Sequence, residues 1–107
     1  MTEAELQDAV VELARFKGWR VAHVRPARTD KGWRTAWSYD GLGFPDLTMV
    51  KGFRLIFAEL KGERGQLSPE QRAWLEALLP TGHYGGVEVY TWRPRDWLDG
   101  TVEQVLR

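Results

Sequence analysis

The sequence predicts a single α/β domain, residues 1–107, in which helices flank a central mixed β-sheet and the elements follow the order αβββαβα. Three observations carry this prediction. The chain has 107 residues, enough for one domain. Its 43% hydrophobic and 12% aromatic content is typical of a folded protein rather than a disordered one. Segments with helical periodicity stand on both sides of apolar, strand-like runs, which is the pattern of an α/β layer arrangement.

The first expected element is an amphipathic helix close to the N-terminus. Its apolar residues recur at helical spacing: Leu6, Ala9, Val10, Leu13 and Phe16. Thr2 and Glu5 match a capping box at its start, and Gly18 follows its basic last turn. A short strand over residues 20–24 is expected next, and it ends before Pro26.

The middle of the chain predicts a long loop followed by a β-hairpin. Residues 27–45 are polar and contain several glycines, and a loop of this length in so small a domain is usually functional or disordered. Two apolar runs, 46–50 and 54–60, then flank Lys51-Gly52. Two strands joined by a short turn that contains glycine form a hairpin.

The last part of the chain predicts a second helix, a strand and a helical tail. Residues 67–79 begin with the cap Ser68, Pro69 at the first helical position, and Gln71 completing a capping box. The expected buried face of this helix is Trp74, Leu75, Leu78 and Leu79. A turn over 80–86, a strand over 87–92 and a short helical tail over 94–106 complete the order.

Composition excludes several classes of site. There is no cysteine, so disulfides, thiolate metal sites and cysteine nucleophiles are ruled out. Fifteen basic residues balance fifteen acidic ones, but seven of the basic ones lie between Arg15 and Arg34 against one acid, which permits a basic patch. No apolar run approaches the ~20 residues of a membrane span. We therefore expect a soluble, cytoplasmic protein with no membrane partner.

Two charged residues end the apolar strand IFAEL. Glu59 and Lys61 are two residues apart and therefore project from the same face of the sheet. An unpaired buried carboxylate costs several kcal/mol, so Glu59 must be paired, hydrogen-bonded or bound to metal. If Lys51-Gly52 are the two turn residues, Asp46 faces Phe57 and is the diagonal neighbour of Glu59, roughly 5–8 Å away. A loop one residue longer, without a bulge, would put the acids on opposite faces.

This arrangement predicts metal-dependent phosphodiester hydrolysis. Two carboxylates this close repel each other unless a cation lies between them, and a hard ion such as Mg²⁺ takes oxygen ligands. The metal would activate water and stabilise charge on the phosphate, while the ammonium of Lys61 would orient the water or neutralise the phosphate oxygens.

The same residues carry a family resemblance. Pro45-Asp46 followed by Glu59-Leu60-Lys61 resembles the motif of the PD-(D/E)XK nuclease superfamily. The order of an early helix with a glutamate, GFPD, a hairpin, ELK, LSPEQRAWLEAL and YTWRPRDW is similar to the VRR-NUC branch, from about Glu5 to Trp97. The departure is the 27–45 segment, rich in Arg, Trp and Gly, which bears on the substrate rather than on the chemistry.

The resemblance implies an endodeoxyribonuclease with a restriction-endonuclease-like core and no organic cofactor. Asp46, Glu59 and the backbone carbonyl of Leu60 would bind Mg²⁺ or Mn²⁺. Lys61 would be the catalytic lysine, with Glu5 and Gln71 as further active-site residues. Stand-alone members of this length resemble phage and bacterial Holliday-junction resolvases, which implies a homodimer acting on branched DNA.

Other interpretations of these residues remain open at this point. Asp46 could be a turn residue after proline, and Glu59 with Lys61 could be a simple ion pair. Glu5 and Gln71 could serve only as helix caps. At the level of the whole protein, the alternatives are a catalytically silent nucleic-acid-binding module and a small interaction protein.

The six tryptophans divide into two groups. Trp19, Trp74, Trp92 and Trp97 lie on segments that need a core, and we expect them to be buried. Trp33 and Trp37 lie in the basic segment, where aromatic rings can stack on bases or contact a second subunit. The candidate DNA-binding residues are Arg25, Arg28, Lys31, Trp33, Arg34 and Trp37.

Overall fold

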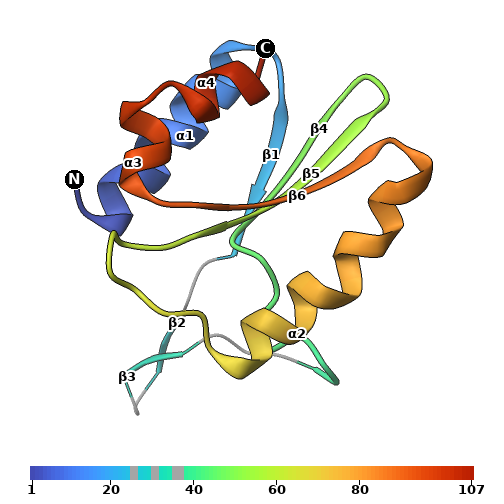
Figure 1. Ribbon diagram of the computed structural model, residues 1–107. Helices are drawn as coiled ribbons and strands as arrows, with labels where there is room; N and C mark the ends of the chain where they lie inside the picture. Colours follow the sequence, from blue (N-terminus) through green and yellow to red (C-terminus); the bar gives the residue numbers. More distant parts are fainter. Residues whose placement is uncertain (25–26, 30–31, 35–37) are drawn as a thin grey trace.

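The protein is an α/β domain built on a four-stranded mixed sheet (Figure 1). The computed structural model describes residues 1–24, 27–29, 32–34 and 38–107, and gives the backbone alone for 27–29, 33–34 and 84. The strands are β1 (Arg20–His23), β4 (Leu47–Lys51), β5 (Arg54–Leu60) and β6 (Val87–Trp92), and the sheet order is β1-β4-β5-β6. The pairs β1–β4 and β4–β5 are antiparallel, whereas β5–β6 is parallel. The predicted mixed sheet with flanking helices is confirmed.

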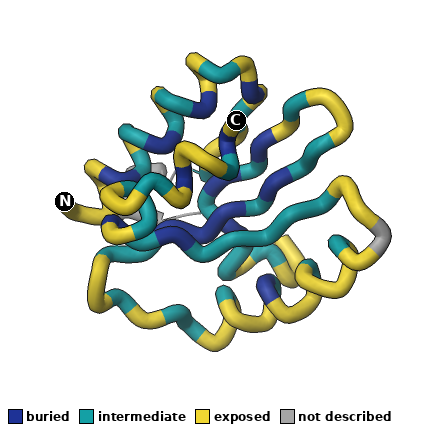
Figure 2. The backbone as a smooth tube through the Cα atoms, turned by 45° about the horizontal axis from the view of Figure 1, so that its top comes forward, coloured by how far each residue is buried: buried dark blue, intermediate teal, exposed yellow. Residues whose placement is uncertain are grey.

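Helices cover both faces of this sheet. Helices α1 (Glu3–Phe16), α3 (Pro94–Leu98) and α4 (Thr101–Val105) lie on one face, and α2 (Pro69–Leu78) lies on the other (Figure 1). The main core lies under α1 and the C-terminal helices, where the buried segments gather, while α2 has a single buried residue (Figure 2). The residues of this core are Leu6, Val10, Ala14, Trp19, Leu47, Met49, Ile56, Ala58, Leu60, Trp92, Val102 and Leu106.

Helix α1 starts and ends as predicted, with Gly18 at φ +92° just after its last turn, but its buried stripe differs from the apolar stripe of the sequence. Both arms of its capping box form, from Glu5 N to Thr2 Oγ1 (3.1 Å) and from Thr2 N to Glu5 Oε1 (2.9 Å). Phe16, the last residue of the apolar stripe read from the sequence, does not join the core, because it is 85% exposed. The inner stripe continues from Val10 to Ala14 instead, and Trp19 enters the core after the chain has turned.

The hairpin between β4 and β5 has a different turn from the predicted one. Its two loop residues are Gly52 and Phe53, because Lys51 pairs with Arg54. Gly52 has φ +59°, and a positive φ at the first loop residue is what a type II′ hairpin requires. The register is therefore shifted by two residues from the predicted one. A shift of two preserves the face on which every side chain lies.

Three further elements differ from the prediction. Within the predicted 27–45 loop, β2 (Ala27–Thr29) pairs with β3 (Gly32–Arg34) in a separate two-stranded sheet. Strands of three residues are too short to produce a recognisable periodicity. The helical tail is divided into α3 and α4 by a left-handed residue, Gly100. The predicted 80–86 turn is largely a 3₁₀ helix, η1 (Leu79–Tyr84). Leu79, predicted to be buried on α2, is 58% exposed where η1 begins.

Candidate active site at the end of β5

Asp46, Glu59 and Lys61 lie together on the sheet face that α2 covers. The β4–β5 register pairs Leu47 with Ala58, and both of these residues are buried on the opposite, α1 side. Extending this register by one residue places Asp46 directly opposite Glu59, rather than diagonal to it. Asp46 is fixed there because its Oδ2 accepts a hydrogen bond from the backbone N–H of Leu60, at 2.7 Å. The bond runs across the two strands, so Asp46 does more than terminate a turn.

Glu59 is a buried acid whose hydrogen bonding is incomplete. Glu59 is only 1% exposed. Oε1 accepts a long hydrogen bond from Gln71 Nε2 (3.4 Å), and Oε2 has no donor among the residues that the structure describes. Burial is the main cause that raises the pKa of Glu59, to about 9, and the neighbouring Asp46 carboxyl raises it further. Glu59 therefore holds its proton more tightly than an ordinary glutamate does.

Lys61 continues the same strand face beyond Glu59. It forms no salt bridge with any described residue, so the simple ion-pair interpretation of Glu59 and Lys61 finds no support here. Its positive charge nevertheless lowers the pKa of Glu59, against the larger effect of burial. An ammonium group is thus present beside the two acids without being neutralised by them.

Gln71 serves both as a helix cap and as a partner of Glu59. Ser68 N donates to Gln71 Oε1 (2.8 Å) and Gln71 N donates to Ser68 Oγ (3.1 Å), which completes the predicted capping box of α2. The amide nitrogen that this box leaves over donates to Glu59. The two roles that the sequence left as alternatives are therefore compatible.

The start of α2 is held close to the site by the loop that precedes β4. Gly43 has φ +85°, and a Cβ built on it would lie 2.5 Å from the backbone carbonyl carbon of Glu70. Phe44 packs edge-on against both Phe57 of β5 and Trp74 of α2, with centroid distances of 5.9 and 5.1 Å. This contact connects the helix to the strand that bears Glu59.

The structure does not bring Glu5 to this group. Its carboxylate bonds to the backbone of Thr2, and this bond is the main cause that lowers the pKa of Glu5. The acid of the first helix whose charge reaches Glu59 is Glu3, which helps to raise the pKa of Glu59. Sequence reasoning missed Glu3 because only the tertiary fold places the start of α1 next to the end of β5 (Figure 1).

The oxygen donors at this site are few, but they are of the kind that a hard cation binds. Among the described residues, no three His, Cys, Asp or Glu side chains gather as a metal site. Asp46 and Glu59 supply two carboxylates, and Leu60, whose N–H contacts Asp46, follows Glu59 along the strand. A Mg²⁺ ion commonly binds through one or two carboxylates and completes its shell with water and phosphate. The Glu59 oxygen that lacks a donor is available for such an ion.

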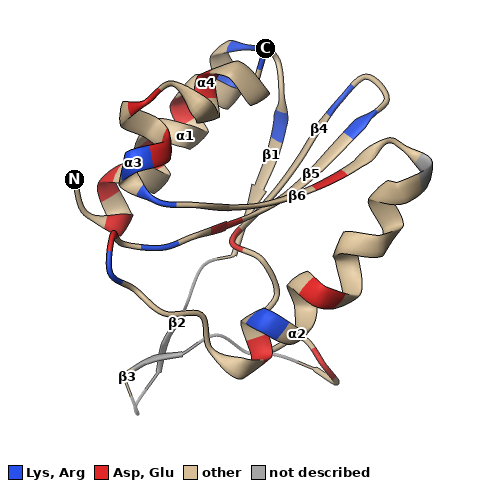
Figure 3. Ribbon diagram, in the orientation of Figure 1, with Lys and Arg blue, Asp and Glu red and all other residues tan. Residues whose placement is uncertain are grey.

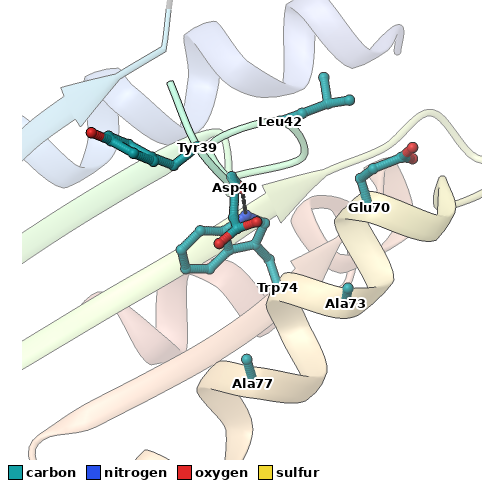
Figure 4. A pocket seen from close by; sticks show the side chains of 7 residues that line it. All are labelled: Tyr39, Asp40, Leu42, Glu70, Ala73, Trp74 and Ala77. Atoms are coloured by element: carbon teal, nitrogen blue, oxygen red, sulfur yellow. Dashed lines mark hydrogen bonds between the residues drawn. The ribbon is translucent and has the colours of Figure 1, made fainter. Parts of the chain in front are cut away.

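A cavity of about 490 Å³ lies between α2 and the loop that precedes β4 (Figure 4). Trp74 forms part of its wall and donates from Nε1 to the backbone oxygen of Asp40, at 2.8 Å. Asp40 and Glu70 are the charged residues of its lining, and both are acidic. The cavity therefore does not suit an anionic ligand.

The tryptophans expected in the core follow the prediction only in part. Trp19 and Trp92 are 3% and 2% exposed, and Trp97 packs partly buried against the core. Trp74 is half-buried on the other side of the sheet, beside α2 and the loop.

The candidate DNA-binding residues lie largely outside the described part of the chain. Arg25, Lys31 and Trp37 are outside the described residues altogether. Arg28, Trp33 and Arg34 are described as backbone only, in β2 and β3. Their assignment to DNA contact stays a prediction.

None of the helices in the described part of the chain combines the length and apolar character needed to cross a membrane. Comparison of the chain with models of protein families, with curated proteins and with solved structures gives no significant match.

Proposed function

We propose that this protein is a Mg²⁺- or Mn²⁺-dependent endonuclease that hydrolyses phosphodiester bonds in DNA. The observation that carries the proposal is the state of Glu59: a buried carboxylate beside Asp46, with one oxygen that lacks a donor in the described residues. A divalent cation between the two acids would offset their repulsion and the cost of burying Glu59. Lys61 on the same strand face supplies the positive charge that a phosphate substrate needs.

The architecture supports a finer assignment, which is part of the proposal. A mixed sheet with α1 and α2 on opposite faces, and with the acids at the end of β5, is compatible with a restriction-endonuclease-like core. The sequence resemblance to the VRR-NUC branch points the same way. Under this assignment the catalytic residues are Asp46, Glu59 and Lys61.

The residues of the site have separate roles in the proposed reaction. Asp46, Glu59 and the Leu60 carbonyl would hold the ion, which when bound acidifies water and stabilises the charge that develops on the phosphate. Leu60 N–H orients the Asp46 carboxylate from the second strand. Gln71 orients Glu59 through its amide nitrogen.

Lys61 acts on the substrate. Its ammonium would orient the attacking water and neutralise the non-bridging phosphate oxygens. Water adds to phosphorus, one P–O ester bond breaks, and the proton lost by the water is balanced by protonation of the departing alkoxide. The products are a phosphate monoester end and a hydroxyl end.

A cleavage assay with Lys61→Ala tests the proposal. We expect the wild-type protein to cut DNA with Mg²⁺ or Mn²⁺, and we expect Lys61→Ala to lower the rate by about 10²-fold or more, as for loss of a charge-stabilising group. Lys51→Ala is the matched control and should retain activity, because Lys51 ends β4 whereas Asp46 stands just before the start of that strand. Circular dichroism checks the fold of both variants. Equal rates for wild type and Lys61→Ala would contradict the proposal.

The substrate and the assembly are also part of the proposal. The resemblance favours branched DNA and a homodimer, so the assay compares a four-way junction, a flap, a duplex and a single strand, alongside sedimentation of the free protein. A catalytically silent binding module is the alternative. It would give no Mn²⁺ binding heat by calorimetry and no cleavage of any of the four substrates.

A further inference from the structure

We infer that the phosphate backbone of the DNA binds to an arginine surface beside the site, formed by Arg64, Arg72, Arg93 and Arg95. The inference rests on the proposed function for its choice of DNA as the ligand. It places the DNA contact in a part of the chain different from the basic 25–37 segment that the sequence suggests.

The four arginines line one cavity of about 350 Å³. Its lining contains one acid, Glu63, so the cavity has an excess of positive charge in a chain whose net charge is zero. The cavity is formed where three segments meet: the turn after β5, the first turn of α2 and the start of α3. Basic positions are visible in each of these segments (Figure 3). A concave, locally basic surface attracts phosphate even on a neutral protein.

Arg93 builds this surface rather than serving as its free charge. Its Nη1 donates to the carbonyl oxygens of Gly62 (2.8 Å) and Gly65 (2.7 Å), and so holds the turn after β5 in place. Glu63 accepts a hydrogen bond from Arg95 N (3.1 Å) and lies 3.5 Å from Arg95 Nε. Both contacts fix the turn against the start of α3.

Arg64 and Arg72 are the arginines available to a ligand. Both are exposed, and neither forms a salt bridge with a residue that the structure describes. Exposed guanidinium groups can bind phosphate oxygens through two parallel hydrogen bonds. They are therefore the positions to change, because their loss leaves the turn intact.

The arginine surface adjoins the proposed active site. A Cβ built on Gly65, which also lines this cavity, would lie 3.4 Å from Cδ of Lys61. Arg72 follows Gln71, whose amide touches Glu59. A strand whose phosphate reaches Lys61 can thus place neighbouring phosphates over Arg64 and Arg72. The 490 Å³ cavity between α2 and the loop that precedes β4 has two acids and no basic residue in its lining, so it does not offer such a path.

The test measures DNA binding separately from cleavage. Arg64→Gln/Arg72→Gln is compared with Lys51→Gln/Arg107→Gln, a control pair that removes the same charge from positions away from the cavity and from the basic 15–34 run. All proteins carry Glu59→Gln and are assayed in EDTA, which prevents cleavage. Kd is measured on a duplex and on a four-way junction over a range of salt concentrations. Each DNA is prepared with 5′-phosphate and with 5′-hydroxyl ends.

We expect the Arg64/Arg72 pair to weaken binding by roughly tenfold or more at low salt. Loss of two phosphate contacts should reduce the slope of log K against log salt on duplex DNA by about 1.8. The control pair should stay within about twofold of its parent. An equal loss with both kinds of end indicates internal phosphodiesters as the ligand, and a loss confined to 5′-phosphate ends indicates the terminal phosphate.

Three results would overturn the inference: no DNA binding by the parent, no effect of the arginine pair, or an equal effect of the control pair. Failure of the proposed function is distinguishable from these. A wild-type protein that binds DNA through the arginine surface but never cuts it leaves the surface standing and removes the nuclease. If the wild type cuts DNA normally and the arginine pair binds DNA as tightly as its parent, the nuclease stands and the arginine surface is ruled out.

Discussion

At the scale of single residues, Glu59 is an acidic side chain at a buried, apolar position, which costs stability. The strand around it is apolar, and its own exposure is 1%. The nearest charges include two further acids, Asp46 and Glu3, which both raise the pKa of Glu59, against a single opposing lysine. Buried acids with a strongly raised pKa cluster at functional sites. Glu59 is therefore the residue at which function and stability can be separated by experiment.

We predict that Glu59→Gln stabilises the metal-free protein at pH 8, by about 1–3 kcal/mol, because at this pH the folded wild type keeps on Glu59 a proton that the unfolded chain has released. Urea unfolding in EDTA measures the free energy. Addition of Mg²⁺ should raise the stability of the wild type and not that of the variant. A variant that is less stable than the wild type in EDTA would contradict this account.

The same residue predicts a pH dependence. Since the pKa of Glu59 is raised to about 9 in the fold, the folded state holds a proton that the unfolded state releases near its ordinary value. Its contribution is complete below that ordinary value, of about 4.3, and is lost as the pH rises through about 9. The free energy of unfolding of the wild type should fall over this window relative to Glu59→Gln. Parallel curves for the two proteins would refute the raised pKa.

At the scale of elements, α2 couples helix formation to the site. The same side chain, Gln71, closes the capping box and donates to Glu59. Gly43 permits the close approach of the loop to the first turn of this helix. Gln71 thus connects the first turn of α2 to Glu59.

Two substitutions distinguish the capping role of Gln71 from its role at the site. Ser68→Ala removes the cap and should lower the free energy of unfolding by about 1 kcal/mol, with cleavage retained. Gln71→Ala should cost a similar amount and also slow cleavage, because Glu59 loses its donor. Thr2→Ala, which removes the corresponding cap of α1, is the control for capping alone. If Gln71→Ala cuts DNA as fast as Ser68→Ala, Gln71 is only a cap.

At the scale of the whole molecule, the C-terminal helices close the core. Leu106 is fully buried, and its carbonyl accepts a hydrogen bond from Trp19 Nε1 at 2.9 Å. Arg54 connects the sheet to the same region. It pairs with Glu88 (2.8 Å), donates to the carbonyl of Val105 (2.9 Å) and lies over the Trp19 ring. Strands β5 and β6, the segment after α1 and helix α4 are therefore joined around one point.

We predict that Leu106→Ala destabilises the protein by about 2–5 kcal/mol, because it leaves a cavity in this closure. Leu98→Ala is the matched control: Leu98 is 76% exposed, and its loss should change stability by about 0.5 kcal/mol or less. Thermal and urea unfolding give both values. Equal effects of the two substitutions would show that the C-terminal segment does not complete the core.

The sequence by itself determined the local structure and the strand face on which the candidate site residues lie. Both capping boxes, at Thr2 and Ser68, form as predicted, because a cap depends on residues three positions apart. The common face of Asp46 and Glu59 also follows from the sequence, since the alternation of a strand has period two. The observed turn, Gly52-Phe53, lies one residue further along the chain than the predicted one. This shifts the register by two residues, which leaves that face unchanged.

Only the tertiary structure decided which distant groups meet. It placed Glu3 rather than Glu5 near Glu59, because the packing of α1 on the sheet sets which residue of its first turn lies by β5. It left Phe16 exposed, and it gathered arginines from three segments into one cavity. Local patterns encode hydrogen bonds between near neighbours and the face of each side chain. Contacts between elements depend on how whole helices and strands pack, which no short stretch of sequence contains.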